Sequence, residues 1–441
     1  MIGCALCKKR RVKCDLTEPE CANCVKRKCR CPGYQKPLRW IHGRRRRKPA
    51  AVDDVGPEPE PTVIQSQPVF DTEVVQLLYD PVPPLFNLPF HADAHLLDVY
   101  FRRTCKAMSM SEYVNLYRTA VIPMIHRSLP LLHVVHSMAA FQIGQIGQGI
   151  LNRRLAVDSL RGDSISAVDR VYTDETVLAM MLLGLTSSWY RDTTCMSNEL
   201  LAARALMKEY VGRVREMTPF VANAYRYWEC VSAFSADTEN PPPCWPFSPS
   251  NDLDPLVGVG TDLFPVLSLL GWWIRRHCSS HCRSKTPSDT RHDLFIRGIE
   301  SALLSWKSPD PPLIHFLGPE AVSAADSYRL AGLISLYRTH PYLGGDLQAI
   351  AKACLESLRM APDDGLTTAS MPLLIAGCEQ KDEEDRVFVI SKFRVLERTV
   401  GLRVISRIKE LVQEVWQREV RGENPFWLNV MIEKGWALVL G

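Results

Sequence analysis

Six cysteines near the start of the chain follow one spacing, C-x2-C-x6-C, that is written twice. They are Cys4, Cys7 and Cys14 in the first half and Cys21, Cys24 and Cys31 in the second. A tetrahedral zinc ion bound by cysteine takes four thiolates, so two ions need more positions than six cysteines supply unless two of them bridge both ions. The repeat suggests Cys4 and Cys21, the first cysteine of each half, as the bridges. The spacing predicts a binuclear zinc cluster in which all six cysteines are ligands.

The segment that carries the cysteines has little else to hold it folded. Its sizeable apolar side chains are Leu6, Val12, Leu16 and Val25, and a segment this short is below the size at which a hydrophobic core alone usually suffices. Structural zinc contributes roughly 10–16 kcal/mol per site in small peptides and makes folding depend on the metal. We expect the segment to fold only with zinc bound.

The cysteines admit three other interpretations. Disulfides would require export, yet charged Lys8–Arg11 lie where the apolar core of a signal peptide would be. A single zinc held by Cys4, Cys7, Cys21 and Cys24 would leave Cys14 and Cys31 unexplained at matching positions. Cys29 breaks the repeat; we interpret it as a spare thiol, the alternative being that it replaces Cys31 as a ligand.

Basic residues surround the cysteines. Residues 1–48 hold 16 Lys and Arg against three acids, a formal charge of +13, whereas the remaining 37 Lys and Arg face 46 Asp and Glu. A basic head on an acidic body points to a polyanion, most simply duplex DNA. The candidate contacts between Cys7 and Cys14 are Lys8, Lys9, Arg10, Arg11 and Lys13. Arginine is the side chain best shaped to grip guanine O6 and N7 in the major groove.

These motifs resemble the fungal binuclear zinc-cluster transcription factors. The resemblance rests on Cys4-Ala-Leu-Cys7-Lys-Lys-Arg-Arg-Val-Lys-Cys14-Asp15, on Pro19-Glu-Cys21-Ala-Asn-Cys24 and on Cys31-Pro-Gly-Tyr34. It implies that the first and fourth cysteines bridge the zincs and that Arg10 and Arg11 read CGG-like triplets, with Lys13 near the backbone. Pro19 matches the proline that joins the two halves. Gly33-Tyr34, followed by Leu38-Arg39-Trp40, is similar to members with the second type of fungal-specific regulatory domain.

The chain departs from many members of that family in two ways. Only Met1–Gly3 precede the first cysteine, where members often carry a basic stretch. A heptad coiled coil often follows the cluster, but here the candidates are Val74, Val75, Leu77 and Leu78, far short of the three or four heptads required. The sequence therefore leaves the formation of a homodimer undecided, because it shows no coiled coil that would hold two chains together.

A basic run and a Pro-rich stretch follow the zinc segment. Arg44, Arg45, Arg46, Arg47 and Lys48 are consecutive, and we interpret the run both as a phosphate-binding tail and as a nuclear import signal. Residues 49–90 are Pro-rich and acidic, a composition that predicts a disordered linker. Within it, Asp71–Asp80 has the acidic and hydrophobic mixture of an activation segment, and a short docking helix is the alternative.

From about His91 onward the chain predicts helices to its end. Three stripes follow i, i+3/4, i+7 spacing: Leu200, Ala203, Met207, Tyr210, Val211 and Val214; Leu347, Ile350, Ala351, Cys354, Leu355 and Leu358; and Val404, Ile405, Ile408, Leu411, Val412 and Val415. Breaks are predicted at Pro241–Pro243, Pro309–Pro312, Pro341 and Pro362. The resemblance implies an all-helical regulatory domain that ends in a Trp-containing segment, here Trp416, Trp427 and Trp436. No apolar run reaches the roughly 18 residues of a membrane span.

Three further patterns are interpreted as structural. His277, Cys278, His281 and Cys282 form i, i+4 pairs that suit a metal, but no third ligand is indicated and Arg275, Arg276 and Arg283 crowd them. Gly144, Gly147 and Gly149 follow a helical pattern instead of the strand that a dinucleotide loop needs. His133 and His136 lie in an apolar stretch and are expected to be core or hinge residues.

The sequence as a whole predicts a mainly α protein in three parts: a zinc-cluster domain with two short helices (1–40), a basic tail and linker (41–90) and a helical regulatory domain (91–441). We expect a nuclear, zinc-dependent regulator of RNA polymerase II transcription that binds double-stranded DNA, and not an enzyme. The further partners that we expect are co-regulators and import receptors. We expect no association with a membrane. The alternative is an enzyme or metabolite-binding protein that the zinc module only tethers to chromatin.

Overall fold

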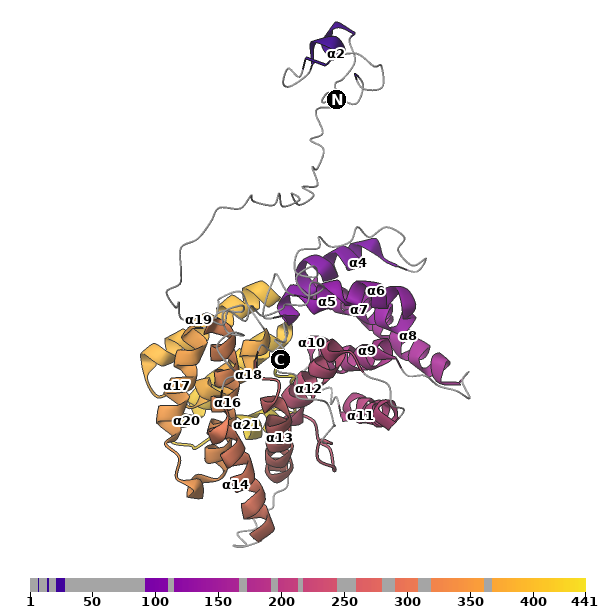
Figure 1. Ribbon diagram of the computed structural model, residues 1–441. Coiled ribbons are helices and arrows are strands. Elements are labelled where there is room, and N and C mark those ends of the chain that lie inside the picture. Colours follow the sequence, from indigo (N-terminus) through magenta and orange to yellow (C-terminus); the bar gives the residue numbers. More distant parts are fainter. Residues whose placement is uncertain are drawn as a thin grey trace, which may run out of the picture. The chain divides into compact units, whose positions relative to one another are not determined.

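The computed structural model describes two compact units, within Met1–Pro68 and within Val69–Gly441. The described residues are 7, 14–15, 21–27, 92–109, 115–165, 173–191, 197–212, 217–243, 259–279, 290–307, 319–360 and 367–441. Every regular element among them is a helix (Figure 1). The prediction of a mainly α protein is therefore confirmed. No helix among these residues is long and apolar enough to cross a membrane.

The small unit contributes one described helix, α2 (Ala22–Lys26). It corresponds to the second of the two short helices expected near the cysteines. The segment of the first, Lys8–Lys13, lies outside the described residues, as do the linker at 49–90 and its candidate segment Asp71–Asp80.

The first half of the large unit is centred on α7 and α9. Its elements are α4 (Ala94–Val99), the π-helical turn η1 (Tyr100–Thr104), η2 (Lys106–Met108), α5 (Leu116–Thr119), α6 (Val121–Arg127), α7 (Leu129–Gln142), α8 (Ile146–Ile165), α9 (Asp174–Leu185), α10 (Ser187–Tyr190), α11 (Ser197–Gly212) and α12 (Pro219–Ala233). Helix α7 packs against α4, α6, α8 and α9, and α9 packs against α11 and α12.

Helix α7 begins and ends at recognisable signals. The Ser128 hydroxyl accepts from the Leu131 N–H at 3.3 Å, and Pro130 occupies the first turn, where a missing N–H costs nothing. Gly144, with φ of 77°, makes the turn into α8. Because α7 is apolar on almost every side, it is buried along nearly its whole length.

The second half is centred on α16 and α18. Its elements are α13 (Leu263–Ser279), α14 (Thr290–Ser305), α16 (Pro319–Thr339), η3 (Pro341–Leu343), α17 (Leu347–Met360), η4 (Thr367–Ala369), α18 (Ser370–Cys378), α19 (Glu383–Val400), α20 (Arg403–Val420) and α21 (Trp427–Glu433). Helix α16 packs against α17 and α18, and α18 also packs against α19 and α20.

The predicted apolar stripes form the inner faces of these helices. In α20 all six stripe residues are buried, and in α17 Ala351, Cys354, Leu355 and Leu358 are buried. In α11, Leu200, Ala203 and Met207 are buried, whereas the side chains of Tyr210 and Val211, and all of Val214, lie outside the described part. Pro341 opens the turn between α16 and α17 as predicted.

The two halves share one core. Helix α12 packs against α13, and the segment after α21 returns to α12, where the Leu440 N–H lies 3.4 Å from the Val231 carbonyl oxygen. Leu438, Val439 and Leu440 are fully buried there. Trp427, one of the three tryptophans noted in the sequence, is buried with its ring centroid 6.0 Å from that of Phe234.

Candidate metal centre and nucleic-acid interface

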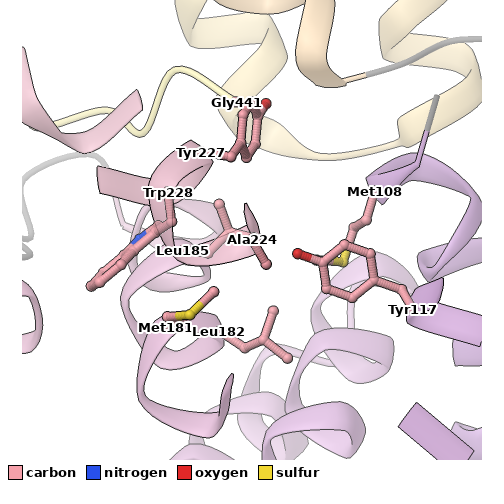
Figure 2. Close-up of a pocket in the computed structure, with 9 residues that line it drawn as sticks. All are labelled: Met108, Tyr117, Met181, Leu182, Leu185, Ala224, Tyr227, Trp228 and Gly441. Carbon is pink, nitrogen blue, oxygen red and sulfur yellow. The ribbon is translucent and has the colours of Figure 1, made fainter. Parts of the chain in front are cut away.

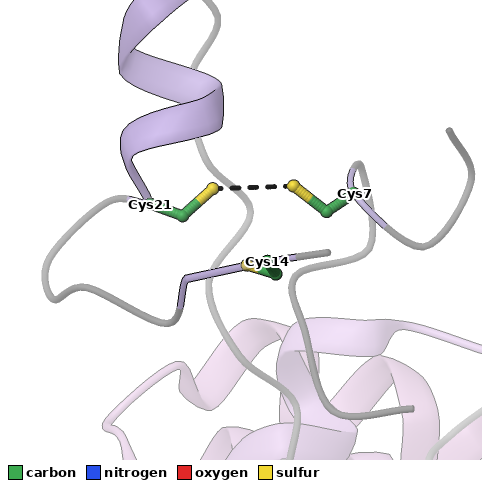
Figure 3. Close-up of side chains that lie close together, drawn as sticks. All are labelled: Cys7, Cys14 and Cys21. Carbon is green, nitrogen blue, oxygen red and sulfur yellow. Dashed lines mark hydrogen bonds between the residues drawn. The ribbon is translucent and has the colours of Figure 1, made fainter. Parts of the chain in front are cut away.

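Three of the six predicted zinc ligands meet in the small unit. The sulfur atoms of Cys7, Cys14 and Cys21 all lie within 4.8 Å of one another, and all three residues are buried. The side chains of Cys7 and Cys21 point toward each other, with 3.7 Å between their sulfur atoms (Figure 3). That distance excludes a disulfide between them, whose S–S bond is about 2.05 Å long.

The sulfur spacing fits zinc. Tetrahedral coordination with Zn–S bonds of about 2.3 Å places two thiolates on one ion about 3.8 Å apart, close to the 3.7 Å between Cys7 and Cys21. Cys14 belongs to this set of three, which speaks against the single-zinc alternative, because that alternative leaves Cys14 without a role. Thiolates are also the ligands that zinc prefers in structural sites.

Of the other three cysteines of the repeat, the structure describes Cys24. Cys24 is 1% exposed in the first turn of α2 and is not among the three sulfurs that converge. Its N–H donates to the Cys21 carbonyl oxygen at 2.9 Å, which closes that turn. Cys4, Cys31 and the spare Cys29 lie outside the described residues, so their assignments stay predictions.

Asp15 has a role that the sequence reasoning missed. Its side chain accepts a hydrogen bond from the N–H of Ala22, the first residue of α2, at 3.0 Å. The residue before the helix, Cys21, makes no capping bond with its own side chain. A carboxylate next to a cysteine, seven residues before a short helix, was the available signal, since acidic groups favour helix N-termini.

The residues expected to bind DNA lie outside the described part of the chain. These are Lys8, Lys9, Arg10, Arg11 and Lys13, together with Arg44, Arg45, Arg46 and Arg47. In the small unit the described cations are Lys26, in the last turn of α2, and Arg27, both exposed. The assignment of base and phosphate contacts therefore stays a prediction.

The histidines His133 and His136 have structural partners in the large unit. The Asp93 N–H donates to His136 Nε2 at 3.2 Å, and His133 Nδ1 lies 3.4 Å from Asn152 Oδ1. Burial lowers the pKa of His136 to about 4, although the nearby Asp93 charge acts in the opposite direction. These contacts agree with the interpretation of His136 as a core residue.

The described residues of the glycine pattern and of the His/Cys pattern lie in helices of the large unit and in the turn between two of them. Gly144 lies in the turn between α7 and α8, and Gly147 and Gly149 lie in α8, so a helix precedes them and not a strand. In the third pattern His277 and Cys278 lie in α13, but their side chains, and His281 and Cys282 altogether, are outside the described part.

An ion pair is buried in the large unit. Arg204 of α11 and Glu229 of α12 lie 2.6 Å apart, with side chains only 9% and 6% exposed. The Tyr225 hydroxyl donates to Glu229 Oε2 at 2.6 Å, and Arg204 donates to the Asn240 carbonyl oxygen at 3.1 Å. The pair ties α11 to α12 and to the segment after it.

An apolar cavity lies beside α9 and α12 (Figure 2). Its lining residues are Met108, Tyr117, Met181, Leu182, Leu185, Ala224, Tyr227, Trp228 and Gly441. Its volume is about 20 Å³, about the room that one water molecule needs. As it stands, the cavity is too small for a metabolite.

Comparison with known proteins identifies both units. Residues 2–41 match the fungal Zn(2)-Cys(6) binuclear cluster domain, and residues 95–441 match the fungal specific transcription factor domain. The first match confirms zinc, two ions per chain, as the cofactor. No solved structure matches the chain.

Curated relatives match over short stretches. White-opaque regulator 2 of Candida albicans is 43% identical over 12% of this chain and 11% of its own. Arginine metabolism regulation protein II of Saccharomyces cerevisiae is 43% identical over 12% of this chain and 6% of its own. An uncharacterized transcriptional regulatory protein of Schizosaccharomyces pombe is 38% identical over 16% of this chain and 13% of its own. The match to the fungal specific transcription factor domain spans well over half of the chain. The protein therefore belongs to the fungal-specific transcription factor family, with a binuclear zinc-cluster domain in its first residues.

Proposed function

We propose that this protein is a zinc-dependent, sequence-specific DNA-binding regulator of RNA polymerase II transcription. The observation that carries the proposal is the convergence of the Cys7, Cys14 and Cys21 sulfurs at zinc-like spacing, inside a basic segment whose formal charge is +13. The names of the matched relatives describe regulators, which supports the same function. The matched ranges 2–41 and 95–441 support the division into residues 1–40, 41–90 and 91–441.

The proposed cluster uses all six cysteines of the repeat. Cys7 and Cys14 complete the sphere of one zinc, Cys24 and Cys31 that of the other, and Cys4 and Cys21 bridge the two. The sulfur of Cys21, a residue of the second half, lies with those of Cys7 and Cys14 from the first half, which supports Cys21 as a bridge. Zinc supplies the folding energy of the segment and holds the basic residues in a fixed arrangement.

The basic residues divide by role. Arg10 and Arg11 read a CGG-like triplet in the major groove, where arginine donates two hydrogen bonds to guanine. Lys8, Lys9, Lys13 and the run Arg44–Arg47 contact phosphates, which adds affinity for every sequence. The same run, with Lys48, directs the protein to the nucleus; a fluorescent fusion whose residues 44–48 are alanine should shift to the cytoplasm.

Selection from random duplexes tests the proposal. Zinc-loaded full-length protein is mixed with a library of random DNA, and the bound fraction is sequenced over several rounds. We expect enrichment of a CGG-like triplet that depends on zinc and disappears with a chelator. Binding without enrichment of any sequence, falling steeply with salt, would instead indicate a nonspecific polycation.

A further inference from the structure

A cleft of about 360 Å³ opens in the large unit. It lies between α13, the end of α16 and the segment that leads into α21. Its lining residues are Trp273, Ile274, Arg338, Thr339, His340, Asn424, Phe426 and Asn429. Small-molecule sites in proteins typically measure about 300–1,000 Å³ and combine apolar walls with a few polar groups. The cleft has the size of such a site, and its lining is more polar than usual, with five polar side chains among the eight.

One wall of the cleft is aromatic and firmly supported. Trp273 and Phe426 are each 9% exposed, and Ile274 is 1% exposed. The ring centroid of Trp273 lies 5.1 Å from that of Phe295 and 4.9 Å from that of His292. Because the rings of Trp273 and Phe426 are almost fully buried, they offer the cleft a small and rigid apolar surface.

The rest of the lining offers amide, hydroxyl and imidazole groups. Asn429 is an exposed residue of α21, and its amide can both donate and accept hydrogen bonds. The Thr339 hydroxyl lies 2.9 Å from His340 Nδ1, which fixes the two side chains relative to each other. A ligand here would be recognised by hydrogen bonds along its edge.

The charged residue of the lining, Arg338, already has its partners. It donates to Asn424 Oδ1 at 2.5 Å and to the Pro425 carbonyl oxygen at 2.8 Å. Its Nε lies 3.3 Å from an oxygen of Glu379, whose side chain is only 7% exposed. An anionic ligand would have to compete with this buried carboxylate, so the cleft favours a neutral one. Arg338 instead fixes the segment before α21 to the end of α16.

We propose that this cleft binds a small, neutral molecule that carries hydrogen-bond donors and acceptors along its edge, such as a nucleobase or an aromatic amide. The site is independent of the proposed DNA contacts, since its lining belongs to the large unit alone. It gives the helical unit a ligand-binding activity of its own.

Saturation-transfer NMR titrations of the zinc-loaded full-length protein, without DNA, test the site. The probes are adenine, uracil and nicotinamide, with benzoate as a planar anion. We expect saturable binding of at least one neutral probe and weaker binding of benzoate. Asn429→Ala should weaken binding about three- to ten-fold, the range for one lost hydrogen bond. Asn429→Trp should weaken binding further, because the indole removes the amide and occupies part of the cleft. Gln413→Ala, at an exposed position of α20, is the matched control and should change nothing.

Three results would overturn the proposal. The first is that none of the neutral probes binds with a Kd below about 10 mM. The second is that Asn429→Trp binds as well as the wild type, which would place the ligand elsewhere. The third is that benzoate binds as tightly as the neutral probes, which would make the cleft an anion site. None of these outcomes depends on whether the protein binds DNA.

Discussion

The carboxylate of Asp15 accepts a hydrogen bond from the backbone N–H of Ala22 at 3.0 Å. This bond links the two cysteine halves without involving a metal ligand. Ala22 begins α2, where backbone N–H groups have no partner within the helix. A negative charge at this end also interacts favourably with the helix dipole. The bond holds the start of α2 beside Cys14, which is one of the three converging cysteines.

We expect Asp15→Ala to weaken the zinc-bound fold without removing a ligand. Loss of a side-chain bond at a helix start typically costs about 0.5–2 kcal/mol, so a chelator should strip the zinc at a lower concentration. Asp15→Asn keeps an acceptor oxygen, so its chelator midpoint should lie between those of Asp15→Ala and the wild type. Glu18→Ala is the matched acidic control. Equal chelator midpoints for Asp15→Ala and the wild type would show that the bond does not support the cluster.

Metal content distinguishes a binuclear cluster from a single-zinc site. Because the sulfur of Cys14 lies with those of Cys7 and Cys21, Cys14→Ser should lower the zinc content below two ions per chain. Cys29→Ser, at the thiol that breaks the repeat, should retain both ions and is the matched control. The measurement is elemental analysis of purified protein after dialysis. Two ions retained in Cys14→Ser would mean that Cys14 is not a ligand.

Removing one partner of the buried pair Arg204–Glu229 should lower the free energy of unfolding by a large amount. Glu229→Ala leaves a guanidinium that is 9% exposed without its carboxylate, a change that typically costs about 3–5 kcal/mol. Replacing both residues, as Arg204→Met with Glu229→Leu, should cost less, because no buried charge is left. Urea unfolding followed by circular dichroism measures both.

A surface pair provides the comparison for the buried one. Arg297 and Asp293 of α14 lie 2.9 Å apart with side chains 55% and 45% exposed, and solvent screens the attraction in such exposed pairs. Asp293→Ala should therefore change the free energy of unfolding far less than Glu229→Ala. Similar losses for the two variants would contradict the role assigned to the buried pair.

Local patterns in the sequence predicted the helices well. The stripe from Val404 to Val415 lies entirely on the buried face of α20, because a helix buries residues that recur every three or four positions. The cysteine spacing likewise predicted a metal cluster, since the ligands follow one another within a short segment. In both cases the residues that act together are close in the sequence.

Contacts between distant segments could not be predicted in the same way. Arg204 and Glu229 lie on different helices, and the cleft joins Trp273, Arg338 and Asn429 from three separate elements. Nothing in the periodicity of one helix says which neighbour it will face. The bond from Asp15 to Ala22 was missed for a related reason, because no periodic pattern pairs a side chain with a backbone N–H seven positions further on.

Stability should depend on pH through His136. In the unfolded chain histidine has a pKa near 6.5, whereas burial lowers the pKa of His136 to about 4 in the folded protein. The groups facing it are Asp93, His133 and Asn152. The unfolded chain therefore takes up the proton first as the pH falls. The free energy of unfolding should decrease from about pH 6.5 toward pH 4, by roughly 2 kcal/mol at pH 5.

His136→Gln isolates this contribution, since glutamine still offers an acceptor to the Asp93 N–H but does not titrate. Denaturant unfolding of both proteins at pH 5 and pH 7.5 gives the comparison, and the difference between them cancels the pH dependence of the zinc unit. The wild type should lose more stability than the variant on acidification. Parallel losses would show that His136 is not the residue responsible.

Base recognition should depend on Arg11 and not on Lys9. A bidentate contact from arginine to guanine is worth roughly 1–3 kcal/mol of discrimination, whereas a phosphate contact adds affinity for all sequences and weakens with salt. Arg11→Ala should flatten the preference for a CGG-containing duplex over a scrambled one, and Lys9→Ala should lower both affinities together. Competition titrations at two salt concentrations measure both effects. If Arg11→Ala lowers specific and scrambled binding equally, with a smaller salt dependence, then Arg11 contacts the backbone and the triplet is read by another residue.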